Sequence, residues 1–129
     1  MLEITGKTAF ITGGARGLGA AAAKKLSSAG ANVFITDILD EAGEATAAEI
    51  REAGGSATFF HHDVTSEEDW AAAVEACITE YGSLDVLLNN AGILISGPVT
   101  ETSLADWRRI TSINVDGVFL GIRTALPHM

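Results

Sequence analysis

Lysine and cysteine are scarce in this sequence, and each shortage excludes classes of function. The 129 residues carry a formal net charge of −9, and the only lysines are Lys7, Lys24 and Lys25. Nucleic acids and anionic membrane surfaces are recognised through concentrated basic charge, so neither partner is expected. No uninterrupted apolar run approaches the length that spans a bilayer. With a single cysteine, no internal disulfide and no secretory signal pattern, we expect a soluble cytoplasmic protein.

Metal ligands and reactive nucleophiles are also sparse. His61, His62 and Asp63 stand together, but adjacent strand residues point to opposite faces of a sheet, so the two histidines are not expected to share an ion. Cys77 lies beside Ile78 on an apolar helix face, with no candidate base in the sequence. We therefore expect no metal site, and a buried cysteine without a catalytic role.

Short apolar runs alternate with helical patterns along the whole chain. Strands are predicted at 8–12, 32–36, 57–61 and 84–89. Helices are predicted at 17–29 and 40–53. A third helix is predicted after a capping box formed by Thr65 and Glu68, and a fourth is predicted to begin at Ser103. This order predicts an α/β fold: a Rossmann-like, doubly wound parallel sheet with four strands in the order 3-2-1-4. We expect one domain over residues 1–129, with its ligand beyond the carboxyl ends of the strands.

A glycine-rich loop joins the first predicted strand to the first predicted helix. The loop, Thr12–Gly19, reads Thr-Gly-Gly-Ala-Arg-Gly-Leu-Gly. Glycines allow a tight turn and leave room for a pyrophosphate, and the helix N-terminus offers it free N–H groups. The lysine of a P-loop is missing. A methyltransferase-type nucleotide loop and an ordinary glycine-rich turn remain alternatives.

Asp37 follows the second predicted strand and indicates which dinucleotide is bound. A carboxylate there can accept hydrogen bonds from the adenosine ribose and would repel a 2′-phosphate, which favours NAD over NADP. Arg16, inside the glycine loop, is a possible partner for such a phosphate. Because the residue after Asp37 is Ile38 and not a basic residue, we expect NAD. A surface or helix-capping aspartate is the alternative.

Together these motifs resemble the short-chain dehydrogenase/reductase family. Thr12–Gly19 matches its Thr-Gly-x-x-x-Gly-x-Gly loop, and residues 89–92 match its Asn-Asn-Ala-Gly signature. Asp63-Val64 is similar to its adenine-contacting pair, and Asn114 aligns with the helix asparagine of its catalytic tetrad. The resemblance runs along the whole chain.

The resemblance implies a role for each matching residue. Asn114 would be catalytic, holding a water in a proton relay, unless it is a helix asparagine bonded to backbone; Asn89 would fix the neighbouring backbone. The cofactor-binding residues would be Gly13, Arg16, Gly17, Leu18 and Gly19 at the pyrophosphate and ribose, Asp37 and Ile38 at the ribose, Asp63 and Val64 at the adenine, and Asn90, Ala91 and Gly92 beneath the cofactor.

The family's proton-transfer groups, a serine and a Tyr-x-x-x-Lys pair, are not found. The one tyrosine, Tyr81, is followed four residues later by Asp85, and no lysine occurs after Lys25. The chain thus resembles the N-terminal half of an oxidoreductase acting on a small alcohol or ketone, and we expect it to be inactive alone. Its last strand and helix would be left without partners, which predicts a homo-oligomer. The alternatives are a non-catalytic nucleotide-binding or self-associating module, or a structural unit that binds no nucleotide.

Overall fold

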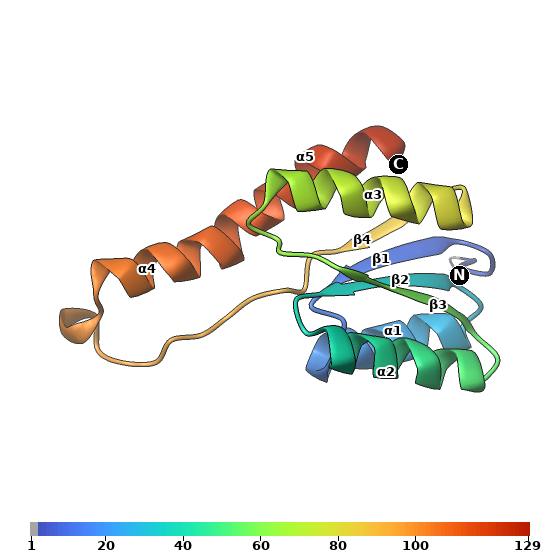
Figure 1. The fold of residues 1–129 in the computed structure, drawn as a ribbon, viewed down its shortest axis with the longest axis horizontal. Coiled ribbons are helices and arrows are strands. Elements are labelled where there is room, and N and C mark those ends of the chain that lie inside the picture. Colours follow the sequence, from blue (N-terminus) through green and yellow to red (C-terminus); the bar gives the residue numbers. More distant parts are fainter. Residues whose placement is uncertain (1–2) are drawn as a thin grey trace.

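Four parallel strands form the centre of the molecule. The computed structural model describes residues 3–129. Strands β1 (Thr8–Thr12), β2 (Asn32–Asp37), β3 (Ser56–His61) and β4 (Val86–Leu88) pair in parallel in the order β3-β2-β1-β4 (Figure 1). This order confirms the predicted half of a doubly wound sheet, with β1 and β4 at the point where the winding reverses.

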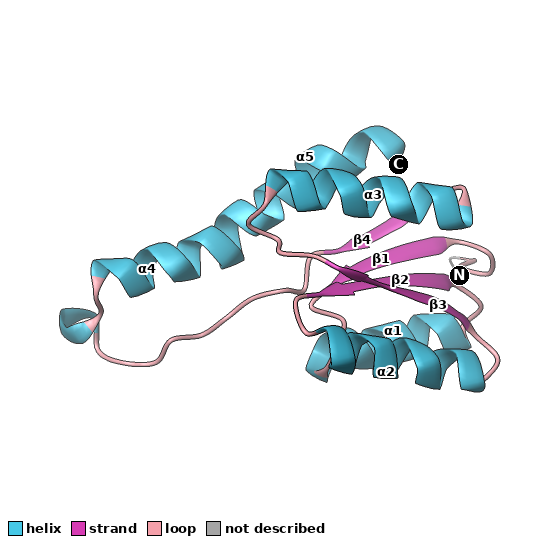
Figure 2. Cartoon of the chain, in the orientation of Figure 1, coloured by secondary structure: helices cyan, strands magenta, loops and turns pink. Residues whose placement is uncertain are grey.

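Helices cover both faces of the sheet. Helices α1 (Gly17–Ser28) and α2 (Asp40–Glu52) lie on one face, while α3 (Glu67–Tyr81) and α5 (Gly117–Ala125) lie on the other (Figure 2). Helix α4 (Leu104–Thr111) projects away from these layers at the end of a long loop. Among the residues that the structure describes, no helix has the length and apolar character needed to cross a membrane.

The two faces of the sheet carry different cores because successive strand residues point to opposite sides. Toward α3, Phe10 packs on Phe34 and Trp70 with ring centroids 5.2 and 5.6 Å apart. Toward α1 and α2 the core is aliphatic: Ile11 and Ile35 are fully buried there. Ala23 of α1 and Ala47 of α2 are fully buried in the same cluster, and their small side chains let these helices lie close to the sheet.

Two predicted boundaries were wrong in detail. Helix α3 is capped by Ser66, whose side chain accepts a hydrogen bond from the Asp69 backbone at 3.1 Å, and not by Thr65. Strand β4 is shorter than the predicted 84–89. The carboxylate of Asp85 accepts a hydrogen bond from the Thr8 backbone N–H at 2.9 Å, and β4 begins at the next residue, Val86.

The predicted last helix is interrupted. Ser103 caps α4 as expected, accepting from the Asp106 backbone N–H at 3.1 Å. A π-helical turn, η2 (Ser112–Asp116), then separates α4 from α5. Short 3-10 turns, η1 (Val99–Glu101) and η3 (Leu126–His128), flank the two helices. Such π turns often mark functional positions in helices, and this one contains Asn114.

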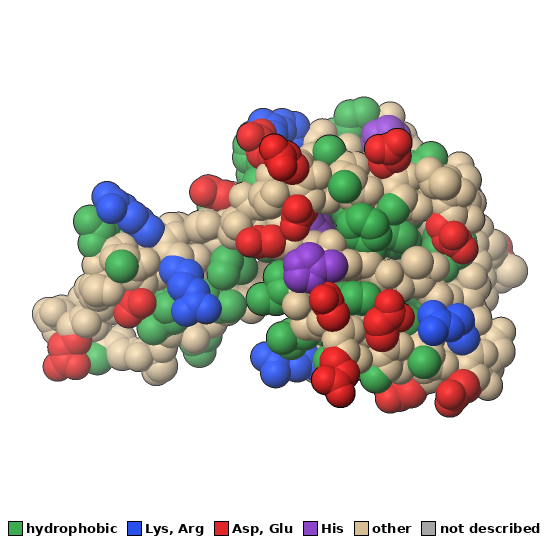
Figure 3. All heavy atoms as spheres, viewed as in Figure 1, with side chains coloured by type: hydrophobic (Ala, Val, Ile, Leu, Met, Phe, Trp, Pro, Cys, Tyr) green, Lys and Arg blue, Asp and Glu red, His purple; other side chains and the backbone are tan. Residues whose placement is uncertain are grey.

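Most of the large exposed hydrophobic side chains lie after β4. Trp70 is fully buried, whereas Trp107 in α4 is 57% exposed. The loop before α4 and the outer face of α5 expose further large apolar side chains, including Leu94, Val99 and Phe119. In Figure 3, acidic side chains are spread over the body on the face shown, and hydrophobic ones reach the surface of the projecting segment.

Candidate functional site

A cavity of about 490 Å³ opens at the carboxyl ends of the strands. It lies between the sheet and the end of α4 nearest to it, which adds Arg109 to the wall. The residues that line it are Gly13, Arg16, Gly17, Leu18, Asp37, Ile38, Leu39, His62, Asp63, Val64, Asn90, Ala91, Gly92, Ile93, Arg109 and Ile113. Of the residues that the sequence singled out as site residues, all but Gly19 and Asn114 are in this wall.

The glycine loop forms one side of the cavity. Gly17 has φ +59°, a conformation that side chains disfavour. A Cβ on Gly19 would lie 2.2 Å from the Gly13 carbonyl oxygen, so only glycine lets α1 start this close to the loop. The first helical hydrogen bond comes from Ala20, to Arg16. The N–H groups before Ala20, at the start of α1, are therefore free for an anion.

Asn90 holds this loop in place from the neighbouring strand. Its side-chain N–H group donates to the carbonyls of Thr12 and Gly13, both at 3.1 Å. The Thr12 hydroxyl in turn accepts from the backbone N–H groups of Asn90 and Ala91, both at 3.0 Å. The backbone-fixing role that the sequence suggested for Asn89 thus belongs to Asn90. Asn89 instead packs against Gly121 of α5.

Asp37 faces the glycine loop from the end of β2. One carboxylate oxygen accepts from the Ala15 backbone N–H and the other from the Leu39 backbone N–H, each at 3.1 Å. Each oxygen keeps a further lone pair. The carboxylate is therefore fixed by two N–H groups while it lines the cavity.

Asp63 and Val64 form the wall beyond β3. The Thr65 backbone N–H and hydroxyl donate to the Asp63 carboxylate at 2.9 and 2.7 Å, and these bonds hold the pKa of that carboxyl below its usual value. Val64 is almost buried, and its carbonyl accepts from the Trp70 indole N–H at 2.9 Å. The pair is thus a charged group beside a fixed backbone segment.

Asn114 lies behind the cavity wall, inside the π turn. Its side-chain oxygen accepts from the Ile93 backbone N–H and its side-chain N–H group donates to the Ile93 carbonyl, both at 2.8 Å. These two bonds tie the loop after β4 to the last helix. The structure thus shows Asn114 bonded to backbone, the alternative that the sequence left open.

The sequence missed several cavity residues. Arg109 and Ile113 are four residues apart, so they share one face of α4 and its π-helical extension. Their position depends on the direction in which α4 projects, which no local pattern specifies. His62 follows β3 and is buried. Strand alternation places it opposite His61 but does not indicate that it lines a cavity.

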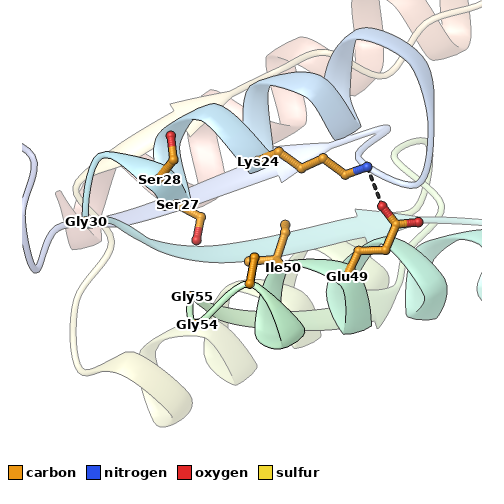
Figure 4. A pocket seen from close by; sticks show the side chains of 9 residues that line it. Lys24, Ser27, Ser28, Gly30, Glu49, Ile50, Gly54 and Gly55 are labelled. Atoms are coloured by element: carbon orange, nitrogen blue, oxygen red, sulfur yellow. Dashed lines mark hydrogen bonds and ion pairs between the residues drawn. The ribbon is translucent and has the colours of Figure 1, made fainter.

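A second hollow, of about 450 Å³, lies between the ends of α1 and α2, away from the glycine loop. Figure 4 shows Lys24 reaching across it to Glu49, at 2.5 Å, with Ser27 and Ile50 on its floor. Its two charged side chains, Lys24 and Glu49, are paired with each other.

Two other reactive side chains stay apart from the main cavity. The Tyr81 hydroxyl contacts the Thr58 hydroxyl at 2.8 Å, toward the amino ends of the strands. Cys77 is buried, as expected, and burial raises the pKa of its thiol to about 12. Within residues 3–129 no cluster of three or more metal-ligating side chains occurs. Tyr81 and Cys77 therefore lie outside the cavity that the glycine loop lines.

The profile of a family described as short chain dehydrogenase matches residues 7–129. Among curated proteins, a 3-alpha-(or 20-beta)-hydroxysteroid dehydrogenase of Mycobacterium bovis is 46% identical over 98% of this chain and 48% of its own length. A cyclopentanol dehydrogenase of Comamonas is 44% identical over 100% of this chain and 52% of its own length. The chain thus spans about half the length of the curated relatives it matches.

Solved structures give the same result. A short-chain dehydrogenase/reductase of Burkholderia phymatum, in complex with NAD, aligns with a TM-score of 0.97 and 34% identity over 100% of this chain and 46% of its own. A metagenomic short-chain oxidoreductase, in complex with NADP, aligns with a TM-score of 0.91 and 35% identity over 99% of this chain and 58% of its own. The neighbours therefore include complexes with both dinucleotides.

Proposed function

The chain belongs to the short-chain dehydrogenase family, whose members are oxidoreductases that bind nicotinamide dinucleotides, and on this premise we propose that it is the NAD-binding portion of such an enzyme. The dinucleotide, when bound, exchanges a hydride with an alcohol or ketone. Residues 1–129 would act as one dinucleotide-binding half-domain. The observation that carries the proposal is the single cavity that brings together the free N–H groups of α1, the Asp37 carboxylate and the Asp63-Val64 wall.

Each part of the wall fits one part of NAD. The N-terminus of α1 and Arg16 would hold the pyrophosphate through N–H groups and positive charge. Asp37 and Ile38 would hold the adenosine ribose, and Asp63 and Val64 the adenine. Asn90, Ala91 and Gly92 would pass beneath the cofactor, where small side chains leave it room. Asn114 would act through the Ile93 backbone that it holds.

The preference for NAD over NADP is part of the proposal. Asp37 presents a fixed carboxylate where a 2′-phosphate would lie, and the two negative charges would repel each other. Arg16 also lines the cavity and would favour the phosphate. We expect Asp37 to dominate, because both its oxygens are held in place by backbone N–H groups.

Calorimetric titration of the 129-residue chain with NAD and NADP tests this proposal. We expect binding with NAD preferred, and the Asp37→Ser variant should lose most of that preference because the repelling charge is gone. Equal affinity of the unaltered chain for both cofactors would contradict the role of Asp37. Binding of neither would contradict the function.

We expect these 129 residues alone to show no efficient turnover. The family's proton-transfer groups are a serine and a Tyr-x-x-x-Lys pair, and the one tyrosine here, Tyr81, is bonded at the other end of the sheet. A positioned acid commonly contributes about 10²–10⁴-fold to the rate of such a step. Reduction of a simple ketone by purified chain with NADH, followed at the absorbance of the cofactor, should show no rate above background.

A self-associating module is the second candidate, and the exposed apolar side chains favour it. Within residues 3–129, strand β4 pairs with β1 alone, so its outer edge is open there. Phe119 and Ile122 of α5 are about half exposed or more, beside that edge. Such surfaces promote pairing between chains. We expect a homo-oligomer by light scattering, and a monodisperse monomer at micromolar concentration would contradict it.

A further inference from the structure

A buried histidine stands behind the adenosine end of the cavity. His62 is 1% exposed and yet belongs to the cavity wall. Across residues 3–129, its Nε2 is the one buried side-chain nitrogen or oxygen without a hydrogen-bond partner. Native structures seldom leave such an atom unpaired without a functional or structural reason.

The contacts of His62 join the two walls of the adenosine end. Its Nδ1 lies 2.9 Å from the Thr36 hydroxyl, and its backbone N–H donates to the Asp37 carbonyl at 3.0 Å. Its ring meets Trp70 edge to face, with centroids 4.3 Å apart. Trp70 in turn donates to the Val64 carbonyl. One continuous set of contacts therefore runs from the end of β2, through His62, to the segment after β3.

The neutral form of the ring fits this environment. With its proton on Nε2, the ring can accept from the Thr36 hydroxyl at Nδ1 while it packs edge to face against Trp70. Burial lowers the pKa of His62 to about 4; the nearby charges of Asp69 and Asp63 oppose this shift, and His61 adds to it. The His62 ring is thus uncharged near pH 7.

We propose that His62 is a positioning residue for the adenosine half of the dinucleotide, and that its bond to Thr36 sets the separation of the Asp37 carboxylate from the Val64 backbone. Adenine and its ribose are directly bonded, so the groups that hold them must stand at a fixed distance from each other. Thr36 immediately precedes Asp37, and Trp70 holds Val64, so His62 acts on both sides. This role rests on the proposed NAD-binding function.

Substitution of His62 separates positioning from packing. The His62→Leu variant fills the same space but loses the bond to Thr36. The His62→Asn variant leaves a gap in the core but can place an amide where Nδ1 stands. If His62 only fills the core, the Leu variant should bind NAD better than the Asn variant. If it positions Asp37, the order of affinity should be reversed.

The experiment is calorimetric titration of each variant with NAD and with ADP-ribose at pH 7, with circular dichroism to show that each is folded. We expect the His62→Leu variant to bind both ligands about tenfold more weakly, the loss that follows from one misplaced hydrogen bond to a charged group. The His62→Asn variant should stay within about threefold of the unaltered chain, since it keeps that bond. The matched control is His61→Leu, whose ring is exposed and faces Asp40 instead of the cavity; its affinity should not change.

Thr36→Val provides the same test from the other partner, with almost no change of shape. Thr36 is fully buried, and this variant should show the loss of the His62→Leu variant even if that variant does not fold. Unchanged affinity in Thr36→Val, or an Asn variant as weak as the Leu variant, would overturn the positioning role alone. Failure of the unaltered chain to bind NAD would overturn the proposed function, and this role with it.

Discussion

The layered body and the arm of this molecule are built differently. In the body, residues 8–88, all five residues of β1 are buried and each helix packs a face against the sheet. In the arm, residues 93–116, no residue is buried, and Leu94, Val99 and Trp107 are exposed apolar side chains. The body buries most of its large apolar side chains and exposes Leu18 and Ile38 at the cavity, whereas those of the arm lie at the surface.

The cavity lies where these two regions meet, and each contributes differently to it. From the body come the glycine loop, Asp37 and the Asp63-Val64 wall. Hydrogen bonds within the body hold Asp37 and Asp63, and Asn90, just after β4, holds the glycine loop. The arm adds Ile93, Arg109 and Ile113, and the two hydrogen bonds between Asn114 and Ile93 hold its two ends together. Binding of a dinucleotide should therefore depend strongly on the body and weakly on the arm.

Replacing the two tryptophans should give the largest contrast. Trp70→Ala removes a buried ring from the body and should cost about 3–5 kcal/mol of the free energy of unfolding. Trp107→Ala removes an exposed ring from the arm and should cost less than about 1 kcal/mol. Urea unfolding of both variants checks this. Equal losses would mean that the arm is packed as tightly as the body.

Acid should destabilise the body through His62. In the folded chain, burial lowers the pKa of His62 to about 4. Between pH 6.5 and pH 4, His62 therefore binds a proton in the unfolded chain but not in the folded chain. Stability is therefore full above pH 6.5 and falls as the pH drops toward 4, by about 3 kcal/mol in all. Urea unfolding at pH 7 and pH 4.5 measures this, and the His62→Leu variant should lose most of the difference. An equal acid effect in that variant would assign it to other groups.

Gly19→Ala should weaken binding more than it weakens folding. Its Cβ would meet the Gly13 carbonyl and the Asn90 amide, which shifts the glycine loop and should lower NAD affinity at least about tenfold. The control, Ala21→Gly, lies in the same helix on its exposed side. It should cost about 1 kcal/mol of stability and leave NAD affinity unchanged. A Gly19→Ala variant that binds like the unaltered chain would place the pyrophosphate elsewhere.

The arm should make the smallest contribution, through Arg109. This arginine lines the cavity, whereas the adjacent Arg108 does not. Arg109→Gln should weaken NAD binding about two- to fivefold, and less at high salt, as expected of an exposed charge. Arg108→Gln removes the same charge outside the cavity and should have no effect. Equal losses in the two variants would reflect net charge only.

The sequence was sufficient to predict the body because its signals are local. Strand, glycine loop and helix follow one another within a few residues, and parallel pairing with right-handed crossovers then restricts the possible strand orders. The cap of α3 was misplaced by one residue because Thr65–Glu68 and Ser66–Asp69 have the same chemistry and spacing.

The arm and the hidden side of the site were beyond local patterns. The π turn at Ser112–Asp116 and the direction of α4 depend on the two bonds between Asn114 and Ile93, which are distant in sequence. The presence of Arg109 in the cavity follows from that direction. The unpaired Nε2 of His62 depends on where Trp70 packs, and no spacing within β3 indicates it.

The most direct test is amide hydrogen exchange of the 129-residue chain with and without NAD. If the site is preformed on the body, the strands and α1–α3 should be protected before NAD is added. NAD should then slow exchange at residues 13–19, 37–39 and 62–64, with little change in residues 94–108 of the arm. A body that gains its protection only with NAD, or protection confined to the arm, would contradict the claim that the body holds the site.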